Sequence, residues 1–331
     1  MSGFIGYLRG DGAAGMVPTP LSNASLELLR DALGESRALS VSMPGGGGFL
    51  APEAFEAQVF ETLDARSSAW ALLSRLESAA GGELVIVTAN DTTNQGSIQT
   101  EGSTRAEGDL AVGRVISRPY VFSSGLIRLS LELANDAPTA EAMVATLLGD
   151  RLRRGLDRVA WVGTGPAQPR GLTTAATNLV TGASGTATSI PWSNIRDLVD
   201  AVAAPYKHAP DGTPLGRWLM SDTTWRHVSA QVDGSGAERG AVDLDIEKGP
   251  HLLGFKVTVD DNMPALGAGN RTVLFGDFQR AGVLRVVQGI RLGRLVEVYA
   301  TSGQIALLAE LRADVIVTDA AAYAAFEHGA A

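Results

Sequence analysis

A long amphipathic pattern that ends in a glycine–proline loop constrains the fold of this chain more than any other feature. From about Thr139, apolar residues recur at spacings of three and four, as on one side of a helix. They are Met143, Val144, Leu147, Leu148, Leu152, Leu156, Val159 and Ala160. Pro138 suits a first helical turn, and Gly163 suits a left-handed C-terminal cap. The pattern predicts a helix about 36 Å long, able to serve as a beam for the rest of the fold.

Charged residues occupy the other side of this predicted helix. They are Arg151, Arg153, Arg154, Asp157 and Arg158. The helix pattern is followed by the segment Gly163–Gly171, in which Pro166, Gln168 and Pro169 lie close together. Glycine and proline at this density predict a rigid turn directly after the helix.

Composition excludes several classes of site. The chain has 331 residues, 45% of them hydrophobic and 19% charged, which is ordinary for a globular protein of one elaborated or two domains. It has no cysteine, so it cannot form disulfides, thiolate zinc sites or iron–sulfur clusters. No apolar run has the length of a membrane span, and the first residues do not form a secretion signal. The net charge of −9 gives no electrostatic affinity for nucleic acid.

Catalytic motifs are also missing from the sequence. No lysine is followed by serine or threonine, as a P-loop requires, and there is no Gly-x-Ser-x-Gly elbow. The four histidines lack the spacing of metal ligands. Glu101 with Glu107 or Asp109 could form a carboxylate pair, but a solvated charge cluster is the better interpretation of so polar a segment. We therefore predict no metal, no cofactor and no enzymatic activity.

The first part of the chain predicts an arm, a body and a hairpin. Residues 1–48 contain one helical pattern, at 21–33, and end in four glycines, which indicates either an arm or a disordered tail. A short helix is predicted at 52–63. Strand patterns at 83–88 and 112–133 flank a polar stretch at 89–111, which predicts an extended hairpin whose use is contact with something else.

The second part mixes helix and strand patterns. We predict a loop at 172–190, a helix from Trp192 to Ala204, a strand at 218–220 and a helix capped by Ser221 or Asp222 and running through Val232. A polar loop at 233–250 precedes further predicted strands, which span 252–259, 272–278, 282–288, 291–299 and 304–317. A closing helix is predicted at 319–326.

Short motifs follow one another in a specific order. They are Gly47–Pro52, Glu101-Gly102 in the polar hairpin, Gly163–Gly171 after the long helix, Trp218–Met220, Leu253–Val257 with Met263-Pro264, and Leu274–Phe278. In this order, over about residues 47–320, the set resembles the major capsid protein of tailed double-stranded-DNA bacteriophages. Encapsulin nanocompartments share that fold.

The resemblance implies an α+β fold with an N-terminal arm, an extended hairpin loop, a peripheral domain with a long spine helix, and an axial domain. The implied ranges are 1–48 for the arm and 89–111 for the extended loop. The peripheral domain comprises 49–88, 112–190 and 271–312, with its tip at 300–303. The axial domain comprises 191–270 and 313–331.

The resemblance also assigns residues to the parts of the fold. Contacts between subunits are implied for Ile98, Glu101, Arg105, Glu107 and Asp109 on the extended loop. The spine helix is represented by Met143, Leu147, Arg151, Arg154 and Arg158, and the loop after it by Gly163, Pro166, Gln168, Pro169 and Gly171.

The implied function is structural. Subunits would assemble as pentamers and hexamers into an icosahedral virion shell that encloses double-stranded DNA without sequence specificity, formed in the host bacterial cytoplasm without a membrane. Implied partners are a portal protein and a cementing protein. About 48 residues before the body are too few for a built-in scaffold, so either a separate scaffold protein is a further partner or the sequence starts after an altered precursor. The alternatives are an encapsulin-like compartment and a gene-transfer-agent capsid.

We predict that the shell is held together without covalent bonds. Some members of the resembled family join a lysine of the extended loop to an asparagine of a neighbouring peripheral domain. This chain has no lysine before Lys207 and no asparagine after Asn270, and the guanidinium of arginine stays protonated. Boiling assembled particles in detergent should release one band near 34.4 kDa, whereas a ladder of covalent oligomers would contradict the prediction.

Overall fold

A computed structural model describes Val59, Glu61 and residues 66–90, 98, 102, 111–132, 138–231, 242–243 and 249–330. The chain divides into two units, Met1–Phe49 and Leu50–Ala331, and all the described residues belong to the second. The predicted arm and its helix at 21–33 lie outside the described residues, as does most of the polar stretch at 89–111. Of the predicted helix at 52–63, Val59 and Glu61 are described, and both are helical.

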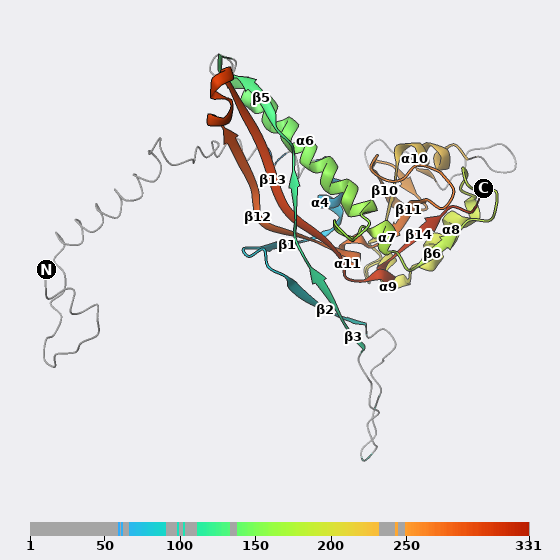
Figure 1. The fold of residues 1–331 in the computed structure, drawn as a ribbon. Coiled ribbons are helices and arrows are strands. Elements are labelled where there is room, and N and C mark those ends of the chain that lie inside the picture. The colour runs from blue at the N-terminus through green and yellow to red at the C-terminus, as the bar shows by residue number, and fades with distance from the viewer. Residues whose placement is uncertain are drawn as a thin grey trace, which may run out of the picture. The chain divides into compact units, whose positions relative to one another are not determined.

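Two long antiparallel strands form the centre of a five-stranded sheet (Figure 1). The strands are β12 (Gly282–Leu295) and β13 (Gln304–Val317), flanked by β1 (Ser74–Ser78), β4 (Tyr120–Ser123) and β5 (Ile127–Ser130). β1 runs parallel to β12, whereas β4 and β5 both pair with β13. The sequence predicted two separate strands where β12 is one, and the 3₁₀ turn Glu297–Ser302 links β12 to β13.

A bulge divides β12 into two halves. Val287 pairs with Arg312 and Ile290 pairs with Leu311, so two residues of β12 have no partner on β13. These two residues, Gln288 and Gly289, both have positive φ angles, 59° and 72°. The bulge interrupts the strand pattern between 288 and 291, which is why the sequence predicted two separate strands there.

The predicted long helix is present as α6 (Pro138–Val162), and it packs on the five-stranded sheet (Figure 1). Its core-facing residues are Val144, Ala145, Leu148, Leu152, Leu156, Ala160 and Trp161. The short helix α4 (Ser68–Leu72) joins the same core through Ala69, Trp70 and Leu72.

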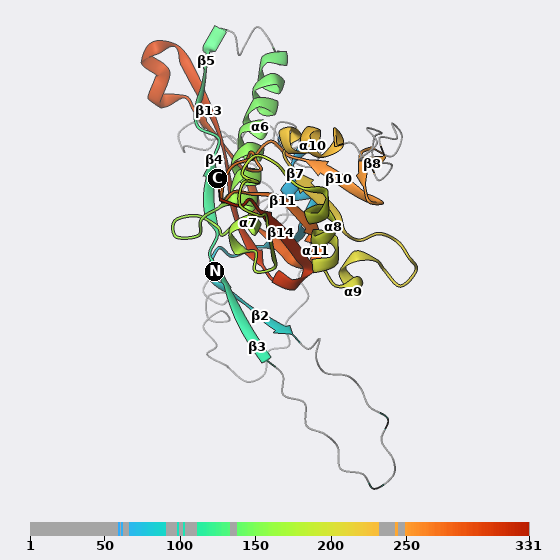
Figure 2. The same cartoon turned by 90° about the vertical axis from the view of Figure 1, so that its right-hand side faces the viewer.

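A second, seven-stranded sheet has the order β6-β14-β11-β7-β10-β9-β8. Its strands β7, β10, β11 and β14 are labelled in Figure 2. Its strands are β6 (Leu179–Thr181), β7 (Arg217–Met220), β8 (Val242–Asp243), β9 (His251–Leu252), β10 (Phe255–Val259), β11 (Arg271–Gly276) and β14 (Tyr323–Glu327). The helices around it are α7 (Leu172–Ala175), α8 (Trp192–Ala201), α9 (Ala204–Lys207), α10 (Asp222–Ser229) and α11 (Phe278–Ala281). Leu219, Leu274 and Tyr323 of this sheet belong to the hydrophobic cluster beneath α6. Other residues of the sheet, among them Trp218, Phe275 and Phe326, form a second cluster with residues of α8 and α10.

Several predictions about this second sheet were wrong. The closing helix predicted at 319–326 is a 3₁₀ turn, Ala320–Ala322, followed by strand β14. The single strand predicted at 252–259 is the hairpin β9–β10, which turns at Leu253 and Gly254 with φ angles of 53° and 82°. The loop predicted at 172–190 contains α7 and β6.

The implied domain ranges stay a prediction, and the strand pairing at two of their boundaries is as follows. β11 pairs with β7 and β14, so residues 271–276 belong to the seven-stranded sheet. Residues 313–317, conversely, complete β13 in the five-stranded sheet.

The predicted hairpin begins as expected. β2 (Leu84–Asn90) pairs in antiparallel fashion with β3 (Ala111–Ser117) and with no other described strand. The two strands run away from both larger sheets (Figures 1 and 2). None of the helices in the described ranges is long and apolar enough to cross a membrane.

Candidate functional site

One exposed face of α6 collects all five residues predicted there. Met143, Leu147, Arg151, Arg154 and Arg158 follow one another at spacings of four, four, three and four, which places them on one side of the helix. Met143 is 66% exposed and Leu147 is 42% exposed, and the three arginines are exposed as well. The predicted apolar stripe was therefore too broad, because it combined these two residues with the buried face.

The loop after α6 closes on itself through its backbone. Gly171 N–H donates to the Gly163 carbonyl at 2.9 Å, and Gln168 Nε2 donates to Thr164 Oγ1 at 2.9 Å. A Cβ atom on Gly163 would lie 2.2 Å from the Pro169 carbonyl oxygen, and one on Gly171 would lie 2.5 Å from the Gly163 nitrogen. Gly163 is thus required by close approach of the backbone. The left-handed conformation predicted for it occurs instead at Gly165, where φ is 101°.

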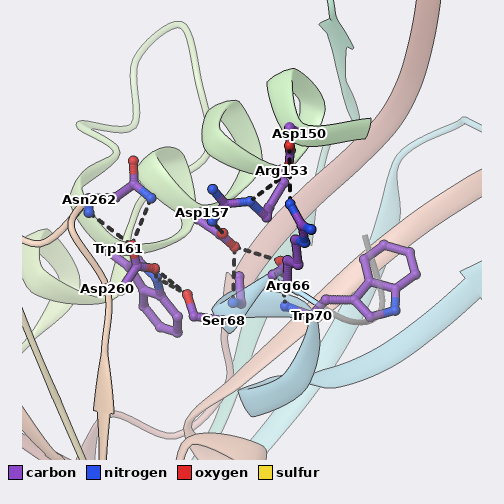
Figure 3. Close-up of polar contacts among 11 residues, drawn as sticks. Arg66, Ser68, Trp70, Asp150, Arg153, Asp157, Trp161, Asp260 and Asn262 are labelled. Atoms are coloured by element: carbon purple, nitrogen blue, oxygen red, sulfur yellow. Dashed lines mark hydrogen bonds and ion pairs between the residues drawn. The ribbon is translucent and has the colours of Figure 1, made fainter. Parts of the chain in front are cut away.

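A buried polar junction lies behind this helix end, where α4, α6 and the turn after β10 meet (Figure 3). Ser67, the N-cap of α4, donates its hydroxyl to Asp157 Oδ1 at 2.6 Å, and Ala69 N–H donates to the same oxygen at 3.1 Å. Trp161 Nε1 donates to Asp260 Oδ2 at 2.8 Å. The junction therefore connects the long helix with both α4 and the seven-stranded sheet.

Asp260 is held tightly from its own turn as well. Its Oδ1 accepts hydrogen bonds from the backbone nitrogen of Asn262 at 2.8 Å and from Asn262 Nδ2 at 2.7 Å. Ser68 donates its hydroxyl to Oδ2 of the same carboxylate. Asp260 is 5% exposed, so its carboxylate has almost no contact with solvent. These hydrogen bonds take the place of hydrogen bonds to water.

Arginines balance the charge at the junction. Arg153 approaches Asp157 Oδ2 at 3.5 Å and Asp150 Oδ1 at 3.7 Å, and Arg66 approaches Asp150 Oδ2 at 3.4 Å. Asp157 was predicted on the charged, outer side of the helix, and this was wrong because it is fully buried. Asp157 lies four residues before Trp161, so both are on the same side of α6. This spacing was the signal in the sequence that Asp157 is buried.

Burial, together with a smaller contribution from the neighbouring Asp260 carboxylate, raises the pKa of Asp157 to about 6. The hydrogen bonds from Ser67 and Ala69 act in the opposite direction. Oδ2 of Asp157 accepts no hydrogen bond from the described residues, so a proton can reside there.

The described residues contain no group of three or more histidine, cysteine, aspartate or glutamate side chains that could hold a metal ion. The polar groups of the junction bond one another instead, so their chemistry is that of a structural joint.

Gly163→Ala should lower the free energy of unfolding of the subunit by about 2–3 kcal/mol, because the new Cβ meets backbone atoms that cannot move aside. Gly155→Ala, within α6, is the matched control. Its Cβ would meet only Phe122 Cδ1, at 3.9 Å, and the change should raise stability by about 1 kcal/mol through helix propensity. Chemical denaturation measures both, and equal effects would contradict the assignment.

Asp157 should make the subunit more stable in acid than at neutral pH. The folded pKa lies above the unfolded value of 3.8, so the folded state binds the proton more tightly. The resulting stability is complete below about pH 4 and is lost as pH rises through about 6. Relative to Asp157→Asn, which keeps an acceptor for Ser67, the wild type should gain about 2 kcal/mol in unfolding free energy from pH 7 to pH 4. Denaturation curves with an equal difference at both pH values would refute this.

Comparison with known proteins places this fold. The model of the phage capsid family matches residues 47–327. Among solved structures, the capsid of a native GTA particle is 18% identical over 87% of this chain and 96% of its own, with a TM-score of 0.66. A chain from Microbacterium phage Oxtober96 is 14% identical over 89% of this chain and 98% of its own, with a TM-score of 0.58. A chain from Mycobacterium phage Cain is 15% identical over 80% of this chain and 91% of its own, with a TM-score of 0.56.

No curated protein matches the chain. The solved structures are 14–18% identical, so they establish the fold alone. The family model matches most of the sequence and therefore establishes the family. The chain belongs to the phage capsid family and is a structural capsid protein.

Proposed function

We propose that this capsid protein is the subunit of a closed shell, assembling with itself as pentamers and hexamers around double-stranded DNA. The observation that carries the proposal is the apolar face of the hairpin β2–β3. Val85 lies opposite Ile116, and Val87 lies two residues further along the same face. These side chains are 52%, 41% and 67% exposed, respectively. Exposed β-branched residues gathered on one face indicate a surface that another molecule covers.

The exposed face of α6 is a second proposed contact. Met143 and Leu147 supply apolar area at its N-terminal half, and three arginines follow at its C-terminal half. Arginine forms paired hydrogen bonds with carboxylates, so this half suits acidic side chains of another copy. Of the loop residues predicted at contacts, Ile98 is fully exposed. Glu101, Arg105, Glu107 and Asp109 lie outside the described residues, and their role stays a prediction.

The loop after α6 has a supporting role in this proposal. Gly163, Pro169 and Gly171 keep its backbone folded, and they leave Pro166 exposed and Gln168 half-buried beside it. We expect this surface to contact a neighbouring subunit.

Further partners belong to the same proposal. A separate scaffold protein, a portal protein and a cementing protein would join the shell without being required for its closure, and the shell would assemble in the cytoplasm of the bacterial host. DNA would be enclosed without sequence specificity, which agrees with the net charge of −9. The protein would have no enzymatic activity. Residues 1–48 would act as an arm, and the two sheets would correspond to peripheral and axial domains.

A gene-transfer-agent capsid is a second candidate, favoured by the TM-score of 0.66 with such a particle. An encapsulin-like compartment is the third. DNA recovered from nuclease-treated particles separates the three, since it would be one repeated genome for a phage, host fragments for a gene-transfer agent, and absent from a compartment.

Electron microscopy of the purified, negatively stained protein tests the proposal directly. We expect closed shells from the full chain, and open or irregular material after deletion of residues 1–44. Subunits that stay separate at every concentration would refute assembly. Normal shells from the deletion would refute only the role of the arm.

Val85→Thr combined with Val87→Thr should impair assembly while the subunit still folds. Threonine keeps the shape and strand preference of valine but resists burial. Each change should therefore weaken a contact by about 1 kcal/mol, so the two together should raise the concentration needed for shells about thirtyfold. Val121→Thr is the control, because Val121 is 61% exposed but lies on β4, outside the hairpin. Light scattering measures assembly, and equal thresholds for all variants would argue against the hairpin contact.

A further inference from the structure

Both strands of the hairpin join the five-stranded sheet at one buried pair of charged residues. Arg285 on β12 and Asp314 on β13 lie directly opposite each other in the antiparallel ladder. They are 3% and 5% exposed, although each is an ionic side chain. Buried ions need partners, and the partners of this pair belong to the two ends of the hairpin.

Arg285 binds the segment that leads from β1 into β2. Its Nε donates to Ser78 Oγ at 3.0 Å, its Nη2 donates to the Ala80 carbonyl at 2.8 Å, and its Nη1 donates to the Gly82 carbonyl at 3.0 Å. The guanidinium is planar and rigid, so three acceptors at once fix the path of this turn relative to β12.

Asp314 binds the other end, where β3 passes into β4. Its Oδ2 accepts from Ser117 Oγ at 2.7 Å and from the Arg118 backbone nitrogen at 2.8 Å. Ser117 Oγ also accepts a hydrogen bond from Arg285 Nη1 at 3.3 Å, so one buried hydroxyl links both halves of the arrangement.

Neighbouring residues restrict the same turn further. The Arg312 guanidinium lies so close to Gly81 that a Cβ there would be 2.3 Å from Nη2. Arg118 Nε and Glu83 Oε1, one from each end of the hairpin, are 2.7 Å apart. That ion pair is exposed and contributes little by itself, which leaves the buried pair as the main restraint.

We propose that Arg285 and Asp314 are positioning residues that set the direction in which β2–β3 leaves the sheet (Figure 2). An apolar pair would fill the same space at no desolvation cost, but it would not hold backbone carbonyls and amides in place. Because the hairpin carries the exposed valines, its direction decides where they meet another copy. This last step rests on the proposed function.

Hydrogen exchange on unassembled subunits tests the restraint independently of shells. Arg285→Met keeps the side-chain length and removes every donor. Amides of residues 84–87 and 114–117 should exchange about tenfold faster or more, as expected from losing one charge-assisted hydrogen bond. Arg271→Met is the matched control, since Arg271 is a partly buried arginine that binds Glu327 and the Thr173 carbonyl in the other sheet. It should leave hairpin exchange unchanged.

Two milder variants keep the test decisive if Arg285→Met does not fold. Ser117→Ala removes only the linking hydroxyl and should speed exchange at both ends of the hairpin. Arg285→Lys should fall between wild type and Arg285→Met, because one ammonium group cannot reach all the acceptors.

Assembly provides the functional readout. Ser117→Ala should broaden or shift the shell diameters, whereas Arg271→Met should give wild-type diameters. Wild-type exchange at both hairpin ends in Ser117→Ala, or acceleration spread evenly over both sheets, would overturn the proposal. If the wild-type protein forms no shells, the proposed function fails, and the exchange data still decide whether the pair restrains the hairpin.

Discussion

The packing of α6 against β13 is the contact on which the other parts of the subunit depend. Core-facing residues alternate along β13 as Leu307, Ala309, Leu311, Ala313 and Val315, and the alanines leave room for the leucines of α6. The loop after the helix and the polar junction attach to α6, and the end of the hairpin at Ser117 attaches to β13 through Asp314. The helix and the strand therefore act together as the frame that places each proposed contact surface.

Local patterns predicted this frame, because a half-buried helix shows its periodicity in its own sequence. They failed at β14, where Ala320–Ala325 has strong helix propensity. The strand fills the gap between β6 and β11 with its residues buried on both faces, and such a strand cannot be distinguished from a helix by periodicity. The hairpin β9–β10 was missed because Leu253-Gly254 is not a typical turn pair.

The five residues assigned to the spine helix from the resemblance lie on one exposed face of α6, and their role as a contact is part of the proposal. The buried ionic groups were not predicted, because their partners are distant in sequence. Asp157 depends on Ser67, which lies 90 residues earlier, and Arg285 depends on the turn after β1. One signal did exist: Arg285 interrupts the run Val283–Val287, and a charge within an apolar strand indicates a buried partner.

The bulge in β12 has a consequence for insertions and deletions. Its two extra residues are an even number, so Leu284 and Val286 before it and Ile290 after it keep facing the same core. Side chains alternate along a strand, so removing Gln288 alone would turn every following residue of β12 to the opposite face. Removing Gln288 and Gly289 together would keep the faces and shorten the strand. Insertions and deletions in β12 are therefore compatible with the fold only in steps of two residues.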